Sequence, residues 1–177
     1  MTIFHHPPHK FEDNTIYFIT AQIYDSQPIM KSIEKKQLFL NSLKAGFHKY
    51  DYLLYAWVIL DEHYHIEFEA RDSKMLSKII NQLHGSLSYL FNRMDNKKGR
   101  KIFQNYWDTC IREEKDLWRR FNYIHHNPVK HGYCQNMEDF TFSSFTYYLK
   151  ERGKAWLDDC FSTYQIVDFT LKEEDTA

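Results

Sequence analysis

Hydrophobic and polar positions along the chain change several times between the spacing of a strand and the spacing of a helix. Residues 15–25 (TIYFITAQIYD) are rich in β-branched and aromatic side chains, which predicts a strand. Residues 29–50 carry apolar side chains at helical spacing, and the apolar run 52–60 (YLLYAWVIL) is short enough for a buried strand. These segments therefore predict a strand, a helix and a second strand.

The next segment, 63–70 (HYHIEFEA), alternates strictly between polar and apolar residues. Successive side chains of a strand point to opposite faces, so His63, His65 and Glu67 share one face. Asp61 and Glu62 join this strand to the preceding one, which predicts a hairpin. Because Asp-Glu is a poor sequence for a tight two-residue turn, a wider turn is the alternative.

The second half of the chain continues the alternation of helix and strand. Helical spacing returns over 73–94, a strand is predicted over 102–112, and a helix is predicted over 113–127, ended by Pro128. A last helix is expected over 140–153. This order of elements predicts one antiparallel sheet with helices packed on it, a ferredoxin-like α+β fold.

Composition narrows the classes of protein to consider. The 177 residues suffice for one domain, and 43% of them are hydrophobic, enough for a core. The chain has five glycines and neither a GxxxxGK[ST] nor a GxGxxG pattern, which excludes phosphate-binding loops of these kinds. Its three cysteines lie far apart and indicate neither a disulfide framework nor a thiolate zinc site. No run approaches 18 apolar residues, so we expect no membrane span and a cytoplasmic protein.

Charge is distributed unevenly, although the formal net charge is only −1. Between residues 93 and 131 there are ten Lys or Arg and five Asp or Glu, a local balance of +5. Aromatic residues such as Trp107, Trp118 and Tyr123 are interleaved with these cations. Cations and stackable rings suit single-stranded nucleic acid, whereas a solvated helix face above core aromatics is the alternative.

Two pairs of residues could carry chemistry. His63 and His65 lie about 6–7 Å apart at Cα on one face of a strand, a gap that one divalent ion can bridge. Tyr123 and Asn127 are four residues apart on a predicted helix and therefore share a face. The amide oxygen of Asn127 is a hard ligand suited to Mg²⁺ or Mn²⁺. The alternatives are two surface histidines, a core tyrosine and an ordinary helix stop before Pro128.

Taken together, these segments resemble the HUH-type single-tyrosine transposases, most closely the REP-associated tyrosine transposases. The similarity covers roughly residues 12–150. It rests on the order of four motifs: His63-Tyr64-His65, FQNYW at 103–107, YIHHNPVKHG at 123–132 and FSSF at 142–145.

The resemblance implies a function and a set of site residues. Tyr123 would be the nucleophile, and His63, His65 and Asn127 would bind a divalent metal, Mg²⁺ or Mn²⁺. The expected reaction is metal-dependent cleavage and strand transfer of single-stranded or hairpin DNA through a 5′-phosphotyrosine intermediate. The transposase domain is expected over 1–155, followed by a C-terminal tail over 156–177. Related enzymes include monomers and dimers that share active sites, which leaves a homodimer open.

Four basic residues are candidates for contacts with the DNA backbone: Arg100, Lys101, Arg119 and Arg120. The chain departs from the family pattern at Leu60-Asp61-Glu62, where Met-Pro-Asn commonly precedes the first histidine. Extra negative charge at this position would tighten cation binding and repel a phosphate. A non-catalytic, domesticated DNA-binding protein on the same fold is therefore one alternative. A metal hydrolase or oxygenase that uses His63, His65 and Glu67 as two histidines and one carboxylate is another.

Overall fold

Four antiparallel strands form a single sheet in the computed structural model, which describes residues 13–169. The elements of this part of the chain are β1 (Thr15–Ile23), α1 (Ile33–Lys49), β2 (Leu53–Ile59), β3 (His63–Ala70), α2 (Leu76–Met94), β4 (Phe103–Ile111), α3 (Glu114–Lys130), α4 (Phe145–Arg152) and α5 (Lys154–Thr163). The strand order is β2-β3-β1-β4, with every neighbouring pair antiparallel. The predicted ferredoxin-like α+β fold is thus confirmed.

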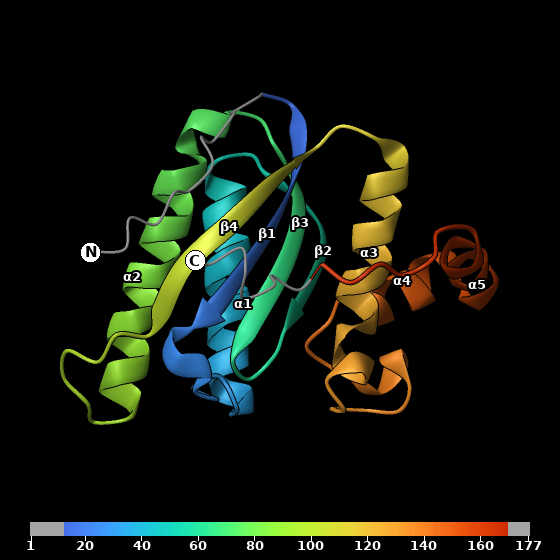
Figure 1. The fold of residues 1–177 in the computed structure, drawn as a ribbon. Coiled ribbons are helices and arrows are strands. Elements are labelled where there is room, and N and C mark those ends of the chain that lie inside the picture. The colour runs from blue at the N-terminus through green and yellow to red at the C-terminus, as the bar shows by residue number, and fades with distance from the viewer. Residues whose placement is uncertain (1–12, 170–177) are drawn as a thin grey trace, which may run out of the picture.

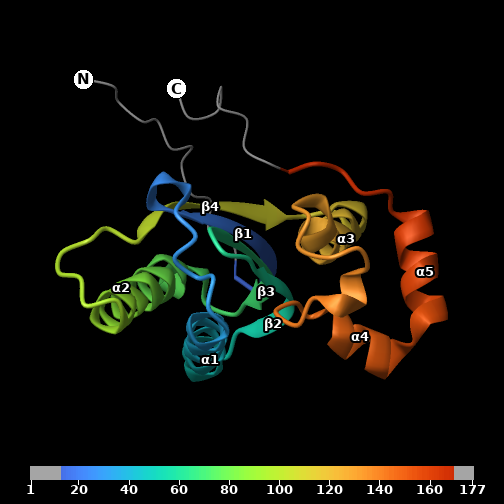
Figure 2. The same cartoon turned by 90° about the horizontal axis from the view of Figure 1, so that it is seen from below.

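Helices cover both faces of this sheet, as Figures 1 and 2 show: α1 and α2 lie on one face, and α3, α4 and α5 on the other. The alternation of β1 explains why two cores form. Tyr17, Ile19 and Ala21 belong to the core under α1 and α2, whereas Phe18 belongs to the core under α3. Each face of the sheet therefore has its own hydrophobic layer.

The hairpin between β2 and β3 determines which face of the sheet the polar residues of β3 occupy. Ile59 pairs with Tyr64, and the Leu60 N–H donates to the His63 carbonyl at 2.9 Å. The connection therefore spans residues 60–62 and is the wider of the two turns considered from the sequence. Tyr64, Ile66 and Phe68 fill the core under α1 and α2, so the polar residues of β3 must face α3.

The end of α3 differs from the expectation that Pro128 stops the helix. The helix runs on to Lys130, and the His131 N–H still donates to the Asn127 carbonyl at 3.0 Å. Proline removes its own N–H and its ring crowds the carbonyl four residues earlier, but only two residues of the helix follow Pro128, so the disturbance is confined to the last turn. Asn127 therefore lies inside the helix, one turn after Tyr123.

The last predicted helix ends at Gly153 as expected, but it begins at Phe145 rather than at residue 140. Gly153 has a φ of +84° and separates α4 from α5, a further helix that the sequence analysis did not predict. The expected start of the tail at residue 156 falls within α5, whose Leu157 and Cys160 are buried. Residues 1–12 and 170–177 of the expected domain and tail lie outside the described residues. None of the helices between residues 13 and 169 is long and apolar enough to span a membrane.

Candidate functional site

The first feature of the site is a pair of imidazoles on β3. His63 and His65 point to the face covered by α3, and their ring centroids lie 5.1 Å apart. Both side chains are buried, and the ring of His65 stacks on that of Phe18 from β1. Strand alternation and the second hydrophobic layer together therefore hold the two rings side by side.

Helix α3 brings the two other predicted residues to the same place. The Asn127 Oδ1 atom lies 3.0 Å from His63 Nε2. One turn earlier, the Tyr123 ring meets the His65 ring edge-on with centroids 5.1 Å apart. The structure thus brings together His63, His65, Tyr123 and Asn127, which come from two elements about sixty residues apart.

The protonation of the histidines decides whether this arrangement suits a cation. His65 Nδ1 lies 2.8 Å from Thr20 Oγ1, and His63 Nδ1 lies 3.2 Å from Glu62 Oε1. In the tautomers with the protons on Nδ1, both Nε2 atoms carry lone pairs. Burial also lowers the pKa of His65 well below its ordinary value, which favours the neutral ring.

In these tautomers three acceptor atoms lie at one place. His63 Nε2 and Asn127 Oδ1 would face each other with no proton between them, and the buried His65 Nε2 has no hydrogen-bond partner. Neighbouring ligands of an octahedral ion at ~2.1 Å lie about 3 Å apart, close to the separation of the first two atoms. This donor set therefore fits Mg²⁺ or Mn²⁺.

A cavity of about 250 Å³ opens beside these groups. Its lining residues are Thr20, Gln22, Ser26, Glu62, His63, His65, Tyr123 and His131. The sequence analysis missed His131, whose ring centroid lies 4.8 Å from that of His63. The same i, i+4 spacing that links Tyr123 to Asn127 links Asn127 to His131, so that signal could have found it.

The Tyr123 ring is 2% exposed and is covered on several sides. Lys130 Nζ lies 5.3 Å from its centroid, and the Phe169 ring meets it edge-on at 5.4 Å. Lys130 also pairs with Asp168 at 2.7 Å. A cation and the segment after α5 therefore border the phenol.

Glu67 does not join the histidines, which contradicts the hydrolase alternative. Among residues 13–169, no group of three or more His, Cys, Asp or Glu side chains is placed to hold a metal ion. Burial raises the pKa of the Glu67 carboxyl well above its usual range, so this group favours the neutral form. A set of two histidines and this carboxylate is therefore absent.

Glu62, by contrast, lies beside the imidazoles. The hydrogen bond between Glu62 and His63 is the main reason why the pKa of the Glu62 carboxyl is lowered to about 2. The Tyr133 hydroxyl donates to Glu62 Oε2 at 2.7 Å and also lowers this pKa. Glu62 is thus a carboxylate at neutral pH.

The four basic candidates for DNA contact lie in two separate places. Arg119 and Arg120 are on α3, where Arg120 pairs with Asp116 at 3.1 Å and lies over the Phe18 ring. Arg100 and Lys101 are in residues 95–102, which we call the basic loop. Arg100 pairs there with Asp95 at 2.5 Å, whereas Lys101 lies 4.6 Å from the Tyr24 ring centroid. The structure thus does not gather the four into one patch.

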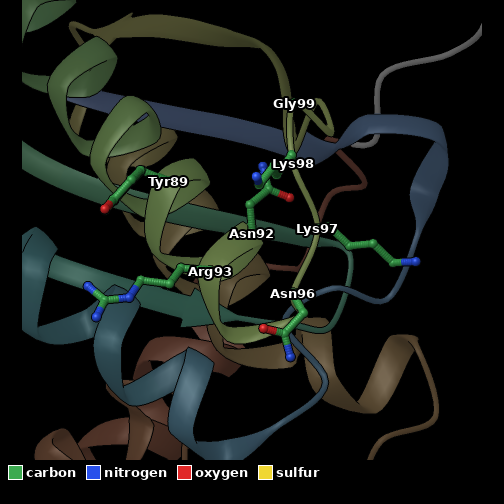
Figure 3. Close-up of a pocket in the computed structure, with 7 residues that line it drawn as sticks. All are labelled: Tyr89, Asn92, Arg93, Asn96, Lys97, Lys98 and Gly99. Carbon is green, nitrogen blue, oxygen red and sulfur yellow. The ribbon is translucent and has the colours of Figure 1, made fainter.

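The basic loop and the end of α2 enclose a hollow of about 450 Å³, shown in Figure 3. Lys97 and Lys98 line it and are exposed, and so is Tyr89, which is 65% exposed. This surface combines exposed lysines with the exposed Tyr89 ring, a combination that suits a nucleic-acid strand.

Comparisons with known proteins find a family model and two relatives that this chain resembles. A family model described as Transposase IS200 like matches residues 13–127. A Haemophilus influenzae protein with the provisional name REP-associated tyrosine transposase is 26% identical over 145 residues, 76% of this chain and 82% of the relative. The REP-associated tyrosine transposase of Escherichia coli is 30% identical over 92 residues, 51% of this chain and 52% of the relative.

A solved structure shares the fold. It is a REP-associated tyrosine transposase bound to a REP hairpin, and it is 21% identical to this chain. The two superpose with a TM-score of 0.69 over 85% of this chain and 88% of the other. The two proteins therefore share their overall fold.

Proposed function

This chain belongs to the IS200-like transposase family, and from that premise we propose that it cleaves and rejoins single-stranded DNA through a covalent bond to Tyr123. The resemblance inferred from the motifs is thereby confirmed. The observation that carries the proposal is the convergence of the Tyr123 ring with His65, and of Asn127 Oδ1 with His63 Nε2 at 3.0 Å.

The proposed reaction needs no nucleotide cofactor. The Tyr123 oxygen attacks a phosphodiester phosphorus and forms a 5′-phosphotyrosine bond, while the bond from phosphorus to the 3′-oxygen breaks. The phenol proton passes through solvent to the departing 3′-oxygen. The 3′-hydroxyl of another strand then reverses the step, which joins two DNA ends and restores the phenol. The phosphotyrosine bond conserves the free energy of the broken linkage.

The chain's own residues would assist this chemistry in two ways. His63, His65 and Asn127 would hold Mg²⁺ or Mn²⁺, a Lewis acid for a non-bridging phosphate oxygen. Lys130 lies over the Tyr123 ring at 5.3 Å, where its ammonium stabilises negative charge that develops on the phenol. Because one chain supplies the tyrosine and the histidines, the proposed site is complete in a monomer.

The surface that connects the cavity to the basic loop is the proposed path of the DNA strand. Ser26 lines the cavity, and Tyr24, two residues earlier, lies against Lys101. The hollow lined by Lys97 and Lys98 lies in the same loop as Lys101. Rings would stack on bases and lysines would neutralise phosphates. Hairpin DNA is the proposed substrate, because the structural relative is bound to a REP hairpin.

The test is formation of a covalent adduct. A labelled single strand that bears a hairpin is incubated with the protein and Mn²⁺, and the products are separated on a denaturing gel. We expect a protein–DNA adduct with the wild type and none with Tyr123→Phe. Tyr147→Phe is the matched control, because that tyrosine is exposed on α4. His63→Ala should abolish the Mn²⁺-dependent cleavage while the fold persists. An undiminished adduct in Tyr123→Phe would overturn the assignment.

One observation favours the second candidate, a non-catalytic DNA-binding protein. Phe169 and Lys130 cover the Tyr123 ring, which leaves a phosphate little access in this conformation. Hairpin binding without an adduct, in both Mg²⁺ and Mn²⁺, would support this candidate over the transposase.

A further inference from the structure

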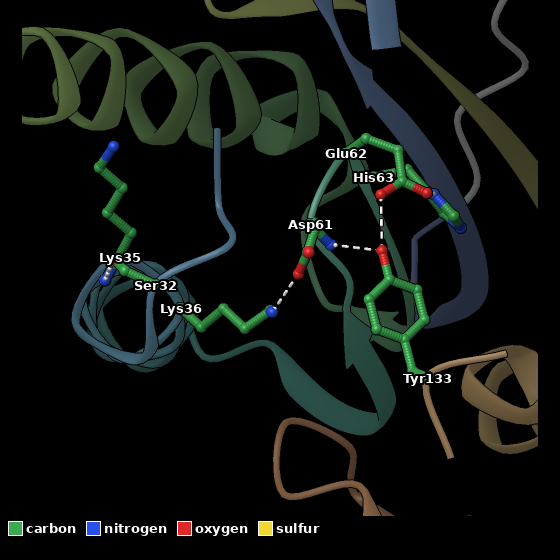
Figure 4. A network of polar contacts seen from close by, with 7 residues as sticks. All are labelled: Ser32, Lys35, Lys36, Asp61, Glu62, His63 and Tyr133. Carbon is green, nitrogen blue, oxygen red and sulfur yellow. Dashed lines mark hydrogen bonds and ion pairs between the residues drawn. The ribbon is translucent and has the colours of Figure 1, made fainter. Parts of the chain in front are cut away.

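Glu62 and Tyr133 form a polar network with His63 that the family resemblance does not explain (Figure 4). Glu62 stands in the turn before β3, where the family commonly has Asn. One carboxylate oxygen lies 3.2 Å from His63 Nδ1, and the other accepts a hydrogen bond from the Tyr133 hydroxyl at 2.7 Å. Both oxygens of this carboxylate therefore have fixed partners.

Tyr133 is itself held in place from the other side. The Asp61 N–H donates to the Tyr133 hydroxyl at 3.3 Å, and the Asp61 carboxylate pairs with Lys36 of α1. The Lys36 ammonium is buried and lies 5.9 Å from the Tyr133 ring centroid. A continuous series of contacts thus runs from α1 through Asp61, Tyr133 and Glu62 to His63.

The two acids beside the site differ in how their charges are balanced. The charge of Asp61 is compensated by Lys36, and the charge of Glu62 is directed at His63 and Tyr133. Asp61 is therefore compensated, whereas Glu62 keeps its negative charge at the lining of the cavity, where it favours a cation.

We infer that Glu62, oriented by Tyr133, is a positioning residue that fixes the His63 ring with its Nε2 lone pair toward Asn127 and the cavity. The inference rests on the proposed function, in which that lone pair binds the cation. A carboxylate that accepts from Nδ1–H selects this tautomer and this ring orientation.

Loss of the carboxylate has a specific consequence. The other tautomer of His63 carries its proton on Nε2, where it can donate to Asn127 Oδ1 across the observed 3.0 Å. That hydrogen bond would occupy two proposed ligands at once and compete with the cation. Loss of a residue that accepts a hydrogen bond from a metal-binding histidine typically lowers the metal affinity about 10- to 100-fold.

The experiment measures Mn²⁺ affinity of the full chain by titration calorimetry. Glu62→Ala should weaken binding about 10- to 100-fold, and Tyr133→Phe should weaken it by a smaller factor. Glu62→Gln should recover most of the affinity, because its amide oxygen still accepts from Nδ1–H. Tyr148→Phe is the matched control and should bind like the wild type, since that hydroxyl donates to the Tyr55 carbonyl instead. Urea midpoints of all variants check that they fold.

Nitrogen-15 spectra of the metal-free histidines supply the second readout. We expect His63 of the wild type to carry its proton on Nδ1, and Glu62→Ala and Tyr133→Phe to gain the Nε2–H form. Unchanged tautomers, or Mn²⁺ affinities within twofold of the wild type, would overturn the inference. A wild type that binds no Mn²⁺ but shows the expected tautomer would instead contradict the metal assignment of the proposed function.

Discussion

Replacement of Lys36 by methionine would remove the cation that anchors the turn before β3. Lys36 and Asp61 form an ion pair whose side chains are only 7% and 14% exposed. The ammonium also lies 5.8 Å and 5.9 Å from the ring centroids of Phe140 and Phe142. The variant would leave the Asp61 carboxylate buried without its partner.

The expected cost follows from this burial. Removal of one member of a buried pair costs about 3–5 kcal/mol. We expect about 3 kcal/mol for Lys36→Met, the low end, because Asp61 retains contact with water and methionine fills the alkyl volume of lysine. Asp61→Asn should cost less, about 2 kcal/mol, because the surrounding rings still stabilise the ammonium.

Urea unfolding followed by tryptophan fluorescence measures these costs. With a denaturant slope of about 2 kcal/mol/M, Lys36→Met should lower the midpoint by about 1.5 M. The double variant should lose about 2 kcal/mol less than the sum of the single losses, since the two residues are in contact. A loss below about 1 kcal/mol for Lys36→Met, or additive losses, would refute the account of the network.

Three further changes test other parts of the molecule. Burial lowers the pKa of His84 to about 4 from 6.5, so the unfolded chain binds its proton first as pH falls. The free energy of unfolding should therefore fall by about 3 kcal/mol between pH 6.5 and 4, and His84→Gln should remove this part of the pH dependence in urea titrations. Lys97→Ala and Lys98→Ala should each lower the slope of log affinity for single-stranded DNA against log salt by about 0.7, whereas Lys150→Ala on α4 should not. Phe169→Ala uncovers Tyr123, the proposed nucleophile, and should accelerate adduct formation in a time course; an unchanged or slower rate would contradict this.

The fold was predictable where the local pattern and the tertiary structure agree. The strict alternation over 63–70 defines β3 without error, because one face of that strand packs in a core and the other faces α3. The end of α3 was not predictable from Pro128 alone, since a proline so near a helix end leaves most of the hydrogen bonds intact. The helix end at Gly153 was predictable, because glycine readily adopts the positive φ of a helix cap, whereas α5 after it was not predicted.

The site was predictable in part for similar reasons. His63 with His65, and Tyr123 with Asn127, follow from the strand and helix periods, which depend only on local geometry. The same helix period could have indicated that Asp116 neutralises Arg120. The contact of Glu62 with Tyr133 joins residues that are 71 positions apart, and no local sequence pattern indicates it.

The most direct measurement of the central claim is the identity of the residue that carries DNA after cleavage. The Mn²⁺ reaction is digested with nuclease and protease, and the peptides that retain a nucleotide are sequenced by mass spectrometry. The account predicts a single modified residue, Tyr123, joined to the 5′-phosphate of the cleaved strand. Modification of an exposed tyrosine such as Tyr89 or Tyr147 instead, with Tyr123 unmodified, would contradict it.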